Sequence, residues 1–264
     1  MKIDLIEKDV SGGKISIEKI KSNLDSHTEI DLEISGLRQD SLEFLIKNYS
    51  NRLNKVRFFK CPRLEDLSPL EELVKASEIN IWWNQKASIL WDVSKNKSLK
   101  TLHLTDFKKT TNLDSVSISQ TIEELEVDGG MWNKNTYDSL DPLINMPKLR
   151  ILGFGAKLKD NRIEPISQIR NLEEISFHSN LFKSEQIAWL KAKLPTDIKS
   201  DILVPFENYS ADPSNGEIIE VLIHGKRKPF VNIKENPQKF ENYVTKFNNL
   251  YQHYLNNPDV AEPI

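Results

Sequence analysis

Cysteine is nearly absent from this sequence: the 264-residue chain has one, Cys61. A single cysteine excludes a disulfide within the chain and fits a reducing compartment. Long apolar runs are also absent, and none approaches the roughly 18 residues that indicate a membrane-spanning helix. The first residues, MKIDLIEKDVSGGK, include acids where a secretory signal needs an unbroken apolar stretch. We therefore expect a cytoplasmic protein without a membrane span.

Positive charge is not in excess either. Lys and Arg number 36 against 39 Asp and Glu, and the formal net charge is -3. Binding to nucleic-acid phosphates depends mainly on Lys and Arg, so nucleic acid is not the expected partner. The content of 38% hydrophobic and 28% charged residues indicates a soluble folded protein.

A hydrophobic pattern repeats along the middle of the chain. Its clearest copy is LNKVRFFKCPRLEDLSPL at residues 53–70. The first, fourth and sixth places of this copy recur in the triplets Leu53-Val56-Phe58, Ala76-Ile79-Ile81, Leu99-Leu102-Leu104, Ile122-Leu125-Val127, Leu149-Leu152-Phe154 and Leu172-Ile175-Phe177. The steps between triplets are 23, 23, 23, 27 and 23 residues. A weaker copy has Ile30 and Leu32 in the fourth and sixth places and His27 in the first, which makes about seven repeats.

A short strand with a compact return, repeated at this period, is the pattern of a leucine-rich repeat. Inward residues of each strand stack on those of neighbouring repeats, which predicts an α/β solenoid with a parallel sheet on one side. The segments DLSPL (66–70) and IEPISQIRNL (163–172) resemble the returns of internalin-like bacterial leucine-rich repeats. This resemblance covers roughly residues 27–200. It implies a curved solenoid that binds proteins on its concave sheet and has no catalytic residues.

Two departures from a regular array predict irregular turns. The side chain in the ninth place of a repeat lies inside the turn, where it can form hydrogen bonds with backbone groups. Only the copies with Ser35, Cys61, Asn84 and Asn180 have a side chain that can do so. An insertion of four residues falls near residues 129–135.

The two ends of the chain break the repeat pattern. Residues 1–26 predict an amino-terminal cap with strands at 2–6 and 14–17 and a helix at 17–24. The solenoid occupies residues 27–204. A connector rich in Pro, Asn and Ser follows at 205–217.

Residues 218–264 predict a β-hairpin and a helix. The strands fall at 218–224 and 230–233, and the helix has Asn236 as its N-cap and Pro237 in its first position. One face of this helix is apolar and mostly aromatic: Phe240, Tyr243, Val244, Phe247, Leu250, Tyr251 and Tyr254. Such a face must be buried, so the hairpin and helix either cap the solenoid or form a dimerisation or docking element. The Lys226-Arg227-Lys228 tip is either solvated or contacts a phosphate.

In each repeat strand, the residues between the inward ones point to the concave face. Phe59 and Trp82 occupy equivalent places there in adjacent repeats, and Trp83 lies just beyond. Exposed aromatic neighbours are typical of a binding hot spot. The alternative is that an insertion or the segment around Trp91 folds over them.

The same face has an acidic edge. Glu124, Glu126 and Asp128 come from one strand, with His103 and Asp106 beside them. This cluster is either a solvated charged surface or a surface that fits a basic partner.

The sequence does not favour catalysis. His103 with Asp106, or His178 with Ser176, lacks a nucleophile elbow, and the five histidines show no metal-ligand spacing. Leucine-rich-repeat ubiquitin ligases have their catalytic cysteine in a separate carboxyl-terminal domain, whereas Cys61 lies in a repeat turn. We expect no enzyme activity, cofactor or metal.

We therefore predict a cytoplasmic, monomeric leucine-rich-repeat protein of bacterial type that binds a protein partner on its concave face. A toxin-neutralising immunity protein and an adaptor both remain open. The alternative is a structural or self-assembling protein that pairs through its carboxyl-terminal helix. The candidate binding residues are Phe59, Trp82, Trp83, His103, Asp106, Glu124, Glu126 and Asp128.

Overall fold

The computed structural model describes residues 1–9, 11–130 and 135–264. The chain forms two compact units. Unit 1 consists of Met1–Lys159 and Ile169–Asn171, and unit 2 consists of Asp160–Gln168 and Leu172–Ile264. The insertion expected near residues 129–135 includes residues 131–134, which lie outside the described residues.

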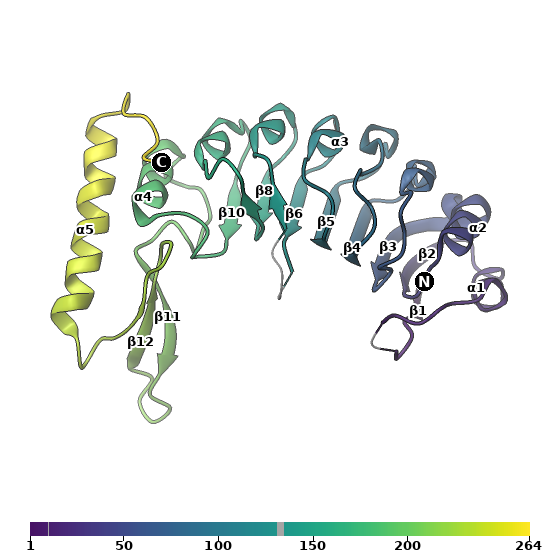
Figure 1. Cartoon of the computed structure of the whole chain (residues 1–264), viewed down its shortest axis with the longest axis horizontal. Coiled ribbons are helices and arrows are strands. Elements are labelled where there is room, and N and C mark those ends of the chain that lie inside the picture. The colour runs from purple at the N-terminus through teal and green to yellow at the C-terminus, as the bar shows by residue number, and fades with distance from the viewer. Residues whose placement is uncertain (10, 131–134) are drawn as a thin grey trace. The chain divides into compact units, whose positions relative to one another are not determined.

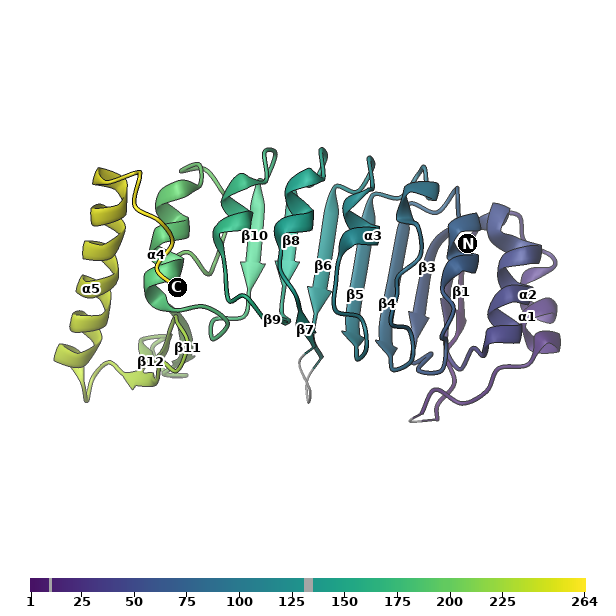
Figure 2. The ribbon, with the colours of Figure 1, turned by 45° about the horizontal axis from the view of Figure 1, so that its top comes forward.

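Unit 1 is built on a parallel β-sheet whose strands follow one another in sequence order (Figures 1 and 2). These strands are β1 (Lys2–Leu5), β2 (Ile30–Ile34), β3 (Leu53–Phe59), β4 (Glu78–Asn84), β5 (Thr101–Phe107), β6 (Glu124–Asp128) and β8 (Ile151–Phe154). The segments between them contain α1 (Ile17–Leu24), α2 (Gln39–Tyr49), α3 (Asp114–Ser117) and the 3-10 helices η1 (Ser50–Arg52), η2 (Ser68–Glu72), η3 (Val93–Lys95) and η4 (Asp141–Asn145). Short strands β7 (Thr136–Tyr137) and β9 (Lys157–Leu158) pair separately.

The predicted register is confirmed from β3 to β8. Residues in the fourth place of each repeat pair in one row across the sheet and are at most 2% exposed: Val56, Ile79, Leu102, Leu125 and Leu152. Residues in the sixth place form a second buried row: Phe58, Ile81, Leu104, Val127 and Phe154. Each repeat therefore buries its apolar side against its neighbours, which it cannot do alone.

The register predicted for the first repeat is wrong by two residues. Leu32 pairs with Val56 and Ile34 pairs with Phe58, so the step is 24 residues rather than 26. Strand side chains alternate with a period of two, and a shift of two residues leaves the same side chains on the same face. The hydrophobic pattern alone could not distinguish the two registers. The shift also places Leu37, rather than Ser35, level with Cys61.

The amino-terminal segment joins the main sheet. β1 pairs with β2 in parallel, and the strand predicted at 14–17 is absent from the described residues. Ser16 is instead the N-cap of α1, and its hydroxyl oxygen accepts a hydrogen bond from the backbone N–H of Lys19 at 3.1 Å. Hydrogen bonding of this kind favours helix initiation over strand.

Unit 2 contains η5 (Glu164–Gln168), β10 (Glu174–Phe177) and α4 (Ser184–Lys193), then an antiparallel sheet and a long helix. The sheet has the order β11 (Phe206–Ala211), β12 (Ile218–Ile223), β13 (Phe230–Asn232). The predicted hairpin is β12 and β13. The segment expected as a connector contains β11, because its backbone pairs along β12 despite a polar composition.

Helix α5 (Pro237–Asn256) begins at the predicted residue. It packs against α4 and β13, with Phe247 and Tyr254 buried. Phe240 lies edge-on to Phe206 at 4.8 Å between ring centroids, over the core of Val221, Ile223 and Val231. The aromatic face therefore packs inside unit 2.

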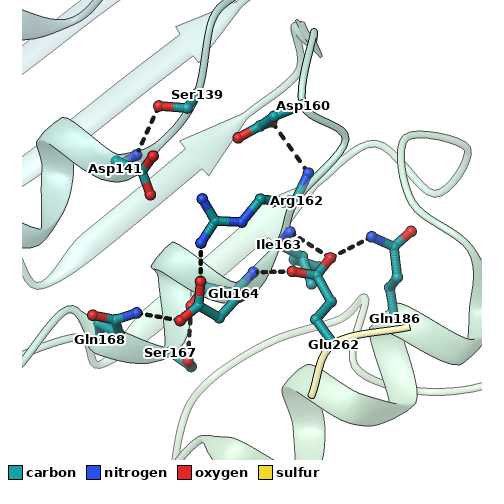
Figure 3. Close-up of polar contacts among 10 residues, drawn as sticks. All are labelled: Ser139, Asp141, Asp160, Arg162, Ile163, Glu164, Ser167, Gln168, Gln186 and Glu262. Carbon is teal, nitrogen blue, oxygen red and sulfur yellow. Dashed lines mark hydrogen bonds and ion pairs between the residues drawn. The ribbon is translucent and has the colours of Figure 1, made fainter. Parts of the chain in front are cut away.

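The residues after α5 return to α4 and η5 (Figure 3). The Glu262 carboxylate accepts hydrogen bonds from the backbone N–H of Ile163 at 2.8 Å and of Glu164 at 2.9 Å. The buried Gln186 side chain donates to the same carboxylate at 2.5 Å. The indole N–H of Trp189 donates to the Val260 carbonyl at 2.9 Å. These contacts hold the end of the chain onto unit 2.

Replacing Glu262 by alanine is expected to lower the stability of unit 2 by about 2 kcal/mol, because three donors lose a charged acceptor. Urea unfolding followed by hydrogen exchange of the α4 amides measures this loss. The matched control is Glu241→Ala on the exposed face of α5, which should change stability by less than about 0.5 kcal/mol. Equal midpoints for Glu262→Ala and the unmodified chain would show that these hydrogen bonds do not stabilise unit 2.

Candidate functional site

The concave face consists of the outward-pointing residues of the unit 1 strands. In β4 and β5 the buried residues alternate with half-buried ones as far as Trp82 and Thr105, as the strand pleat requires. Strand register sets these outward residues in rows. One row consists of Phe59, Trp82, Thr105 and Asp128 on β3 to β6.

Phe59 and Trp82 form an aromatic pair on this face. Their rings are stacked, with centroids 4.5 Å apart and planes within 8° of parallel. The separation matches the roughly 4.8 Å between neighbouring strands, so each ring stands above its own strand. Both side chains are half-buried. The predicted neighbours therefore meet directly.

Two cations of this chain lie over the Phe59 ring. The Arg57 guanidinium carbon is 5.1 Å from the ring centroid and the Lys60 ammonium is 5.2 Å away. Cations within about 6 Å of an aromatic centroid are attracted by the negative ring face. The aromatic pair is thus flanked by positive charge on its β3 side.

Trp83 directly follows Trp82 near the end of β4, and Asp106 directly follows Thr105 near the end of β5. Both have left-handed backbone conformations, with φ of 70° for Trp83 and 57° for Asp106, and Lys60 at the end of β3 has φ of 53°. For a residue as bulky as Trp this conformation is an outlier that costs about 1 to 3 kcal/mol. These conformations could not be predicted from the sequence. Gly, Asn and Asp are the residues that usually adopt them, and of the three residues only Asp106 belongs to that group.

The acidic edge consists of Glu124, Glu126 and Asp128 on β6. His103 on β5 reaches the first two: its Nε2 is 2.9 Å from Glu124 and its Nδ1 is 3.7 Å from Glu126. The Asn80 side-chain amide lies 3.4 Å from the same Nδ1. The structure therefore brings His103 and the acidic residues together as expected, and adds Asn80.

Asp106 is half-buried and close enough to Asp128 for their charges to interact. Burial raises the pKa of the Asp106 carboxyl, a hydrogen bond from Gln85 opposes this shift, and the negative charge of Asp128 adds to it. A Cβ added to Gly130 would lie 2.7 Å from the Asp106 carboxyl carbon. Gly130 thus leaves room for the Asp106 side chain over the end of β6.

Charges on the amino-terminal strands of the face compensate one another. Lys55 lies 2.9 Å from Glu78, and Glu33 lies 2.8 Å from Lys2 and 3.7 Å from Arg57. The hydrogen bond and the negative charge of Glu78 raise the pKa of Lys55. Exposed pairs of this kind add little stability, but they leave this part of the face nearly neutral.

Trp91, proposed above as a cover for the aromatic pair, is buried in a return segment. Its indole N–H donates to Asn96 at 2.7 Å, and the Asn96 amide donates to the Leu70 carbonyl at 2.8 Å. Asn84 in the ninth place behaves as predicted, since its side-chain oxygen accepts from the backbone N–H of Lys86 and Ala87.

Cys61 is buried in its repeat turn, and burial raises the pKa of its thiol to about 12. The thiolate is the reactive form, so Ellman's reagent should react with native Cys61 at least about 100-fold more slowly than with the chain unfolded in guanidinium. Absorbance of the released thiolate measures both rates. Equal rates would contradict the burial of this turn.

The other candidate features considered in the sequence do not lie on the concave face. Within the described part of the chain, no group of three or more His, Cys, Asp and Glu side chains is placed to hold a metal ion. His178 and Ser176 belong to unit 2. No helix of the described residues has the length and apolar character for a membrane span.

Parallel strands at a 23-residue step, buried inward rows and returns through short helices define the repeat type. The repeats are leucine-rich repeats. No protein-family model and no curated protein matches the chain. Among solved structures it is similar to internalin C2 (inlC2) from Listeria monocytogenes, at 18% identity and a TM-score of 0.40, over 57% of this chain and 61% of that one.

A second similar structure is the internalin inlF, also from Listeria monocytogenes. The identity is 14% and the TM-score is 0.46, over 78% of this chain and 59% of that one. The leucine-rich-repeat chain thus spans about three fifths of the length of the internalins that it matches. The leucine-rich-repeat architecture predicted from the sequence is confirmed by the parallel pairing and the two buried rows of this chain itself.

Proposed function

We propose that this leucine-rich-repeat chain is a non-enzymatic interaction module that binds a protein partner on the concave face of unit 1. The observation that carries this proposal is the aromatic pair of Phe59 and Trp82, stacked at 4.5 Å on an outward-facing row of the sheet. Large aromatic side chains at the centre of a face supply most of the binding energy in many interfaces. Trp83 lies beside them, in the left-handed conformation that Lys60 and Asp106 share at the same place of the adjacent repeats.

Affinity capture from the source cells tests this proposal. The full chain should retain a partner, and Phe59→Ala with Trp82→Ala should lose it. The matched control replaces Tyr209 and Phe230, another ring pair with centroids 4.5 Å apart, which lies in unit 2. If the Phe59 and Trp82 variant recovers the same partner at equal yield, then these two residues are not the binding site.

Two roles fit such a module, a toxin-neutralising immunity protein and an adaptor. An immunity protein has a partner that harms the cell and is silenced in the complex, whereas an adaptor binds two partners at once. Growth of cells that express the captured partner, with and without this chain, separates the two roles. A cytoplasmic location is part of this proposal, and the single buried cysteine, Cys61, is compatible with it.

Self-assembly through α5 is the competing proposal. Phe247 and Tyr254 of that helix are buried within unit 2, which leaves less apolar surface for a second copy. We expect light scattering after gel filtration to give the mass of one chain. A stable dimer that Leu255→Glu on exposed α5 surface dissociates would favour self-assembly instead.

A further inference from the structure

His103 lies between two carboxylates and an amide on the concave face. Strand register places it between Asn80 on β4 and Glu126 on β6, one row away from Trp82. Its Nε2 is 2.9 Å from a Glu124 carboxylate oxygen, and its Nδ1 is 3.4 Å from the Asn80 side-chain nitrogen. A carboxylate only accepts hydrogen bonds, and the amide nitrogen of asparagine only donates them. The two contacts therefore fit a neutral ring whose proton is on Nε2.

Protonation of this ring changes the partner that Nδ1 can bind. In the imidazolium form Nδ1 becomes a donor, and it then faces the NH2 group of Asn80, which is also a donor. Glu126 offers an acceptor, because its Oε2 is 3.7 Å from Nδ1 and its side chain is 47% exposed, so that it can move closer. The ring thus has two discrete hydrogen-bonding states, with Asn80 when it is neutral and with Glu126 when it is protonated.

Glu124 and Glu126 have a titratable counter-ion rather than a permanent one. Among the residues that the structure describes, the one basic side chain within ion-pair distance of either carboxylate is that of His103. On the amino-terminal strands the corresponding partner is a lysine, as in the pair of Lys55 with Glu78 at 2.9 Å. Lysine stays charged at physiological pH, whereas histidine ordinarily gains its charge between about pH 8 and about pH 5. The chain therefore compensates these two carboxylates only when His103 is protonated.

The wider surroundings of His103 are acidic as well. The charged groups that the register places around the ring are Glu124, Glu126 and Asp128 on β6, Glu78 on β4, and Arg57 on β3 beyond Asn80. On its own strand, Asp106 follows near the end of β5. Protonation of His103 makes this part of the face less negative.

We propose that His103 is a proton-operated switch on the concave face: protonation transfers Nδ1 from Asn80 to Glu126 and weakens the binding of the protein partner. This switch rests on the proposed function and adds its regulation by pH. A partner that covers the acidic edge binds best with complementary positive charge, and an imidazolium competes with that charge for the same carboxylates. The change also occurs beside the aromatic pair, since Asn80 and Trp82 are successive outward residues of β4.

Nuclear magnetic resonance of the full chain tests the switch without a partner. Ring-nitrogen signals of His103, assigned with His103→Gln, distinguish a protonated from an unprotonated nitrogen. We expect a proton on Nε2 alone at about pH 8 and on both nitrogens at about pH 5, with a shift of the Asn80 side-chain NH2 signals at the same midpoint. In His103→Gln the Asn80 signals should show no such midpoint.

Surface plasmon resonance, with the partner from affinity capture immobilised, tests the effect on binding. The loss of affinity between about pH 7.5 and about pH 5.5 should be at least about threefold larger for the full chain than for His103→Gln. The matched control His253→Gln, on exposed α5 surface in unit 2, should lose as much affinity as the full chain. Titratable groups of the partner act equally on all three chains, so this comparison isolates His103.

Three results would overturn the switch: a proton on Nδ1 alone at neutral pH, Asn80 signals that do not follow the titration of His103, or a loss of affinity at low pH that is no larger in the full chain than in His103→Gln. If partner binding at neutral pH still depends on Phe59 and Trp82, such a result removes only the regulation by pH. If partner binding does not depend on them, the proposed function fails as well.

Discussion

Replacing Phe59 and Trp82 together by alanine is expected to lower the affinity for the captured partner about 100-fold or more. Truncation of a central aromatic anchor commonly costs about 2 kcal/mol or more, and the two stacked rings lose their contacts with the partner and with each other. Most of the loss should appear as faster dissociation, since interface variants of one complex differ mainly in that rate. Surface plasmon resonance with immobilised partner measures both rates.

The fold should tolerate this change. Both rings are half-buried on the sheet face, whereas the inward neighbour Phe58 is fully buried. The control with Tyr209→Ala and Phe230→Ala removes two rings that are 63% and 46% exposed, and it should leave the affinity within about twofold. Equal losses in both double variants would show that aromatic truncation in general, and not the concave face, weakens binding.

The second large effect is expected at Gly36, in the turn after β2. Gly36 has φ of +68°, and a Cβ at this residue would lie 2.2 Å from the Gly12 carbonyl oxygen. Alanine there suffers both the left-handed penalty and a collision with backbone, so Gly36→Ala should lower the free energy of unfolding by about 3 kcal/mol or more. Urea denaturation followed by circular dichroism measures the loss.

Gly216 separates the two causes. It also has a left-handed conformation, with φ of +73°, but nothing lies within 4 Å of the position of an added Cβ. Gly216→Ala should therefore cost only about 1 kcal/mol. If Gly36→Ala is no more destabilising than Gly216→Ala, then the close approach of the amino-terminal segment to the first turn is not a packing constraint.

The repeats from β3 to β8 could be predicted from sequence because each inward place is apolar and the spacing is nearly constant. The first repeat could not be placed correctly, because a two-residue shift keeps the alternation of Ile30, Leu32 and Ile34 unchanged. β11 was missed for a different reason. Its strand character comes from pairing with β12, and its residues Glu207 and Asn208 are of types that are depleted in strands.

The candidate site also has features that could be predicted from the sequence and features that could not. The neighbours Phe59 and Trp82 follow from the 23-residue step alone, and so does the proximity of His103 to the acidic edge. The left-handed conformation of Trp83 could not be predicted, because no local residue preference favours it. The contact of Glu262 with Ile163 joins residues far apart in the sequence and depends on tertiary packing.

Oxidative footprinting of the full chain with and without the captured partner tests the central proposal most directly. Hydroxyl radicals modify exposed aromatic side chains, so the rates at Phe59, Trp82 and Trp83 report whether the concave face is covered. We expect the partner to protect these three residues, while Tyr209 and Phe230 of unit 2 are oxidised at unchanged rates. Protection of Tyr209 and Phe230, with no change at Trp82, would contradict binding through the concave face.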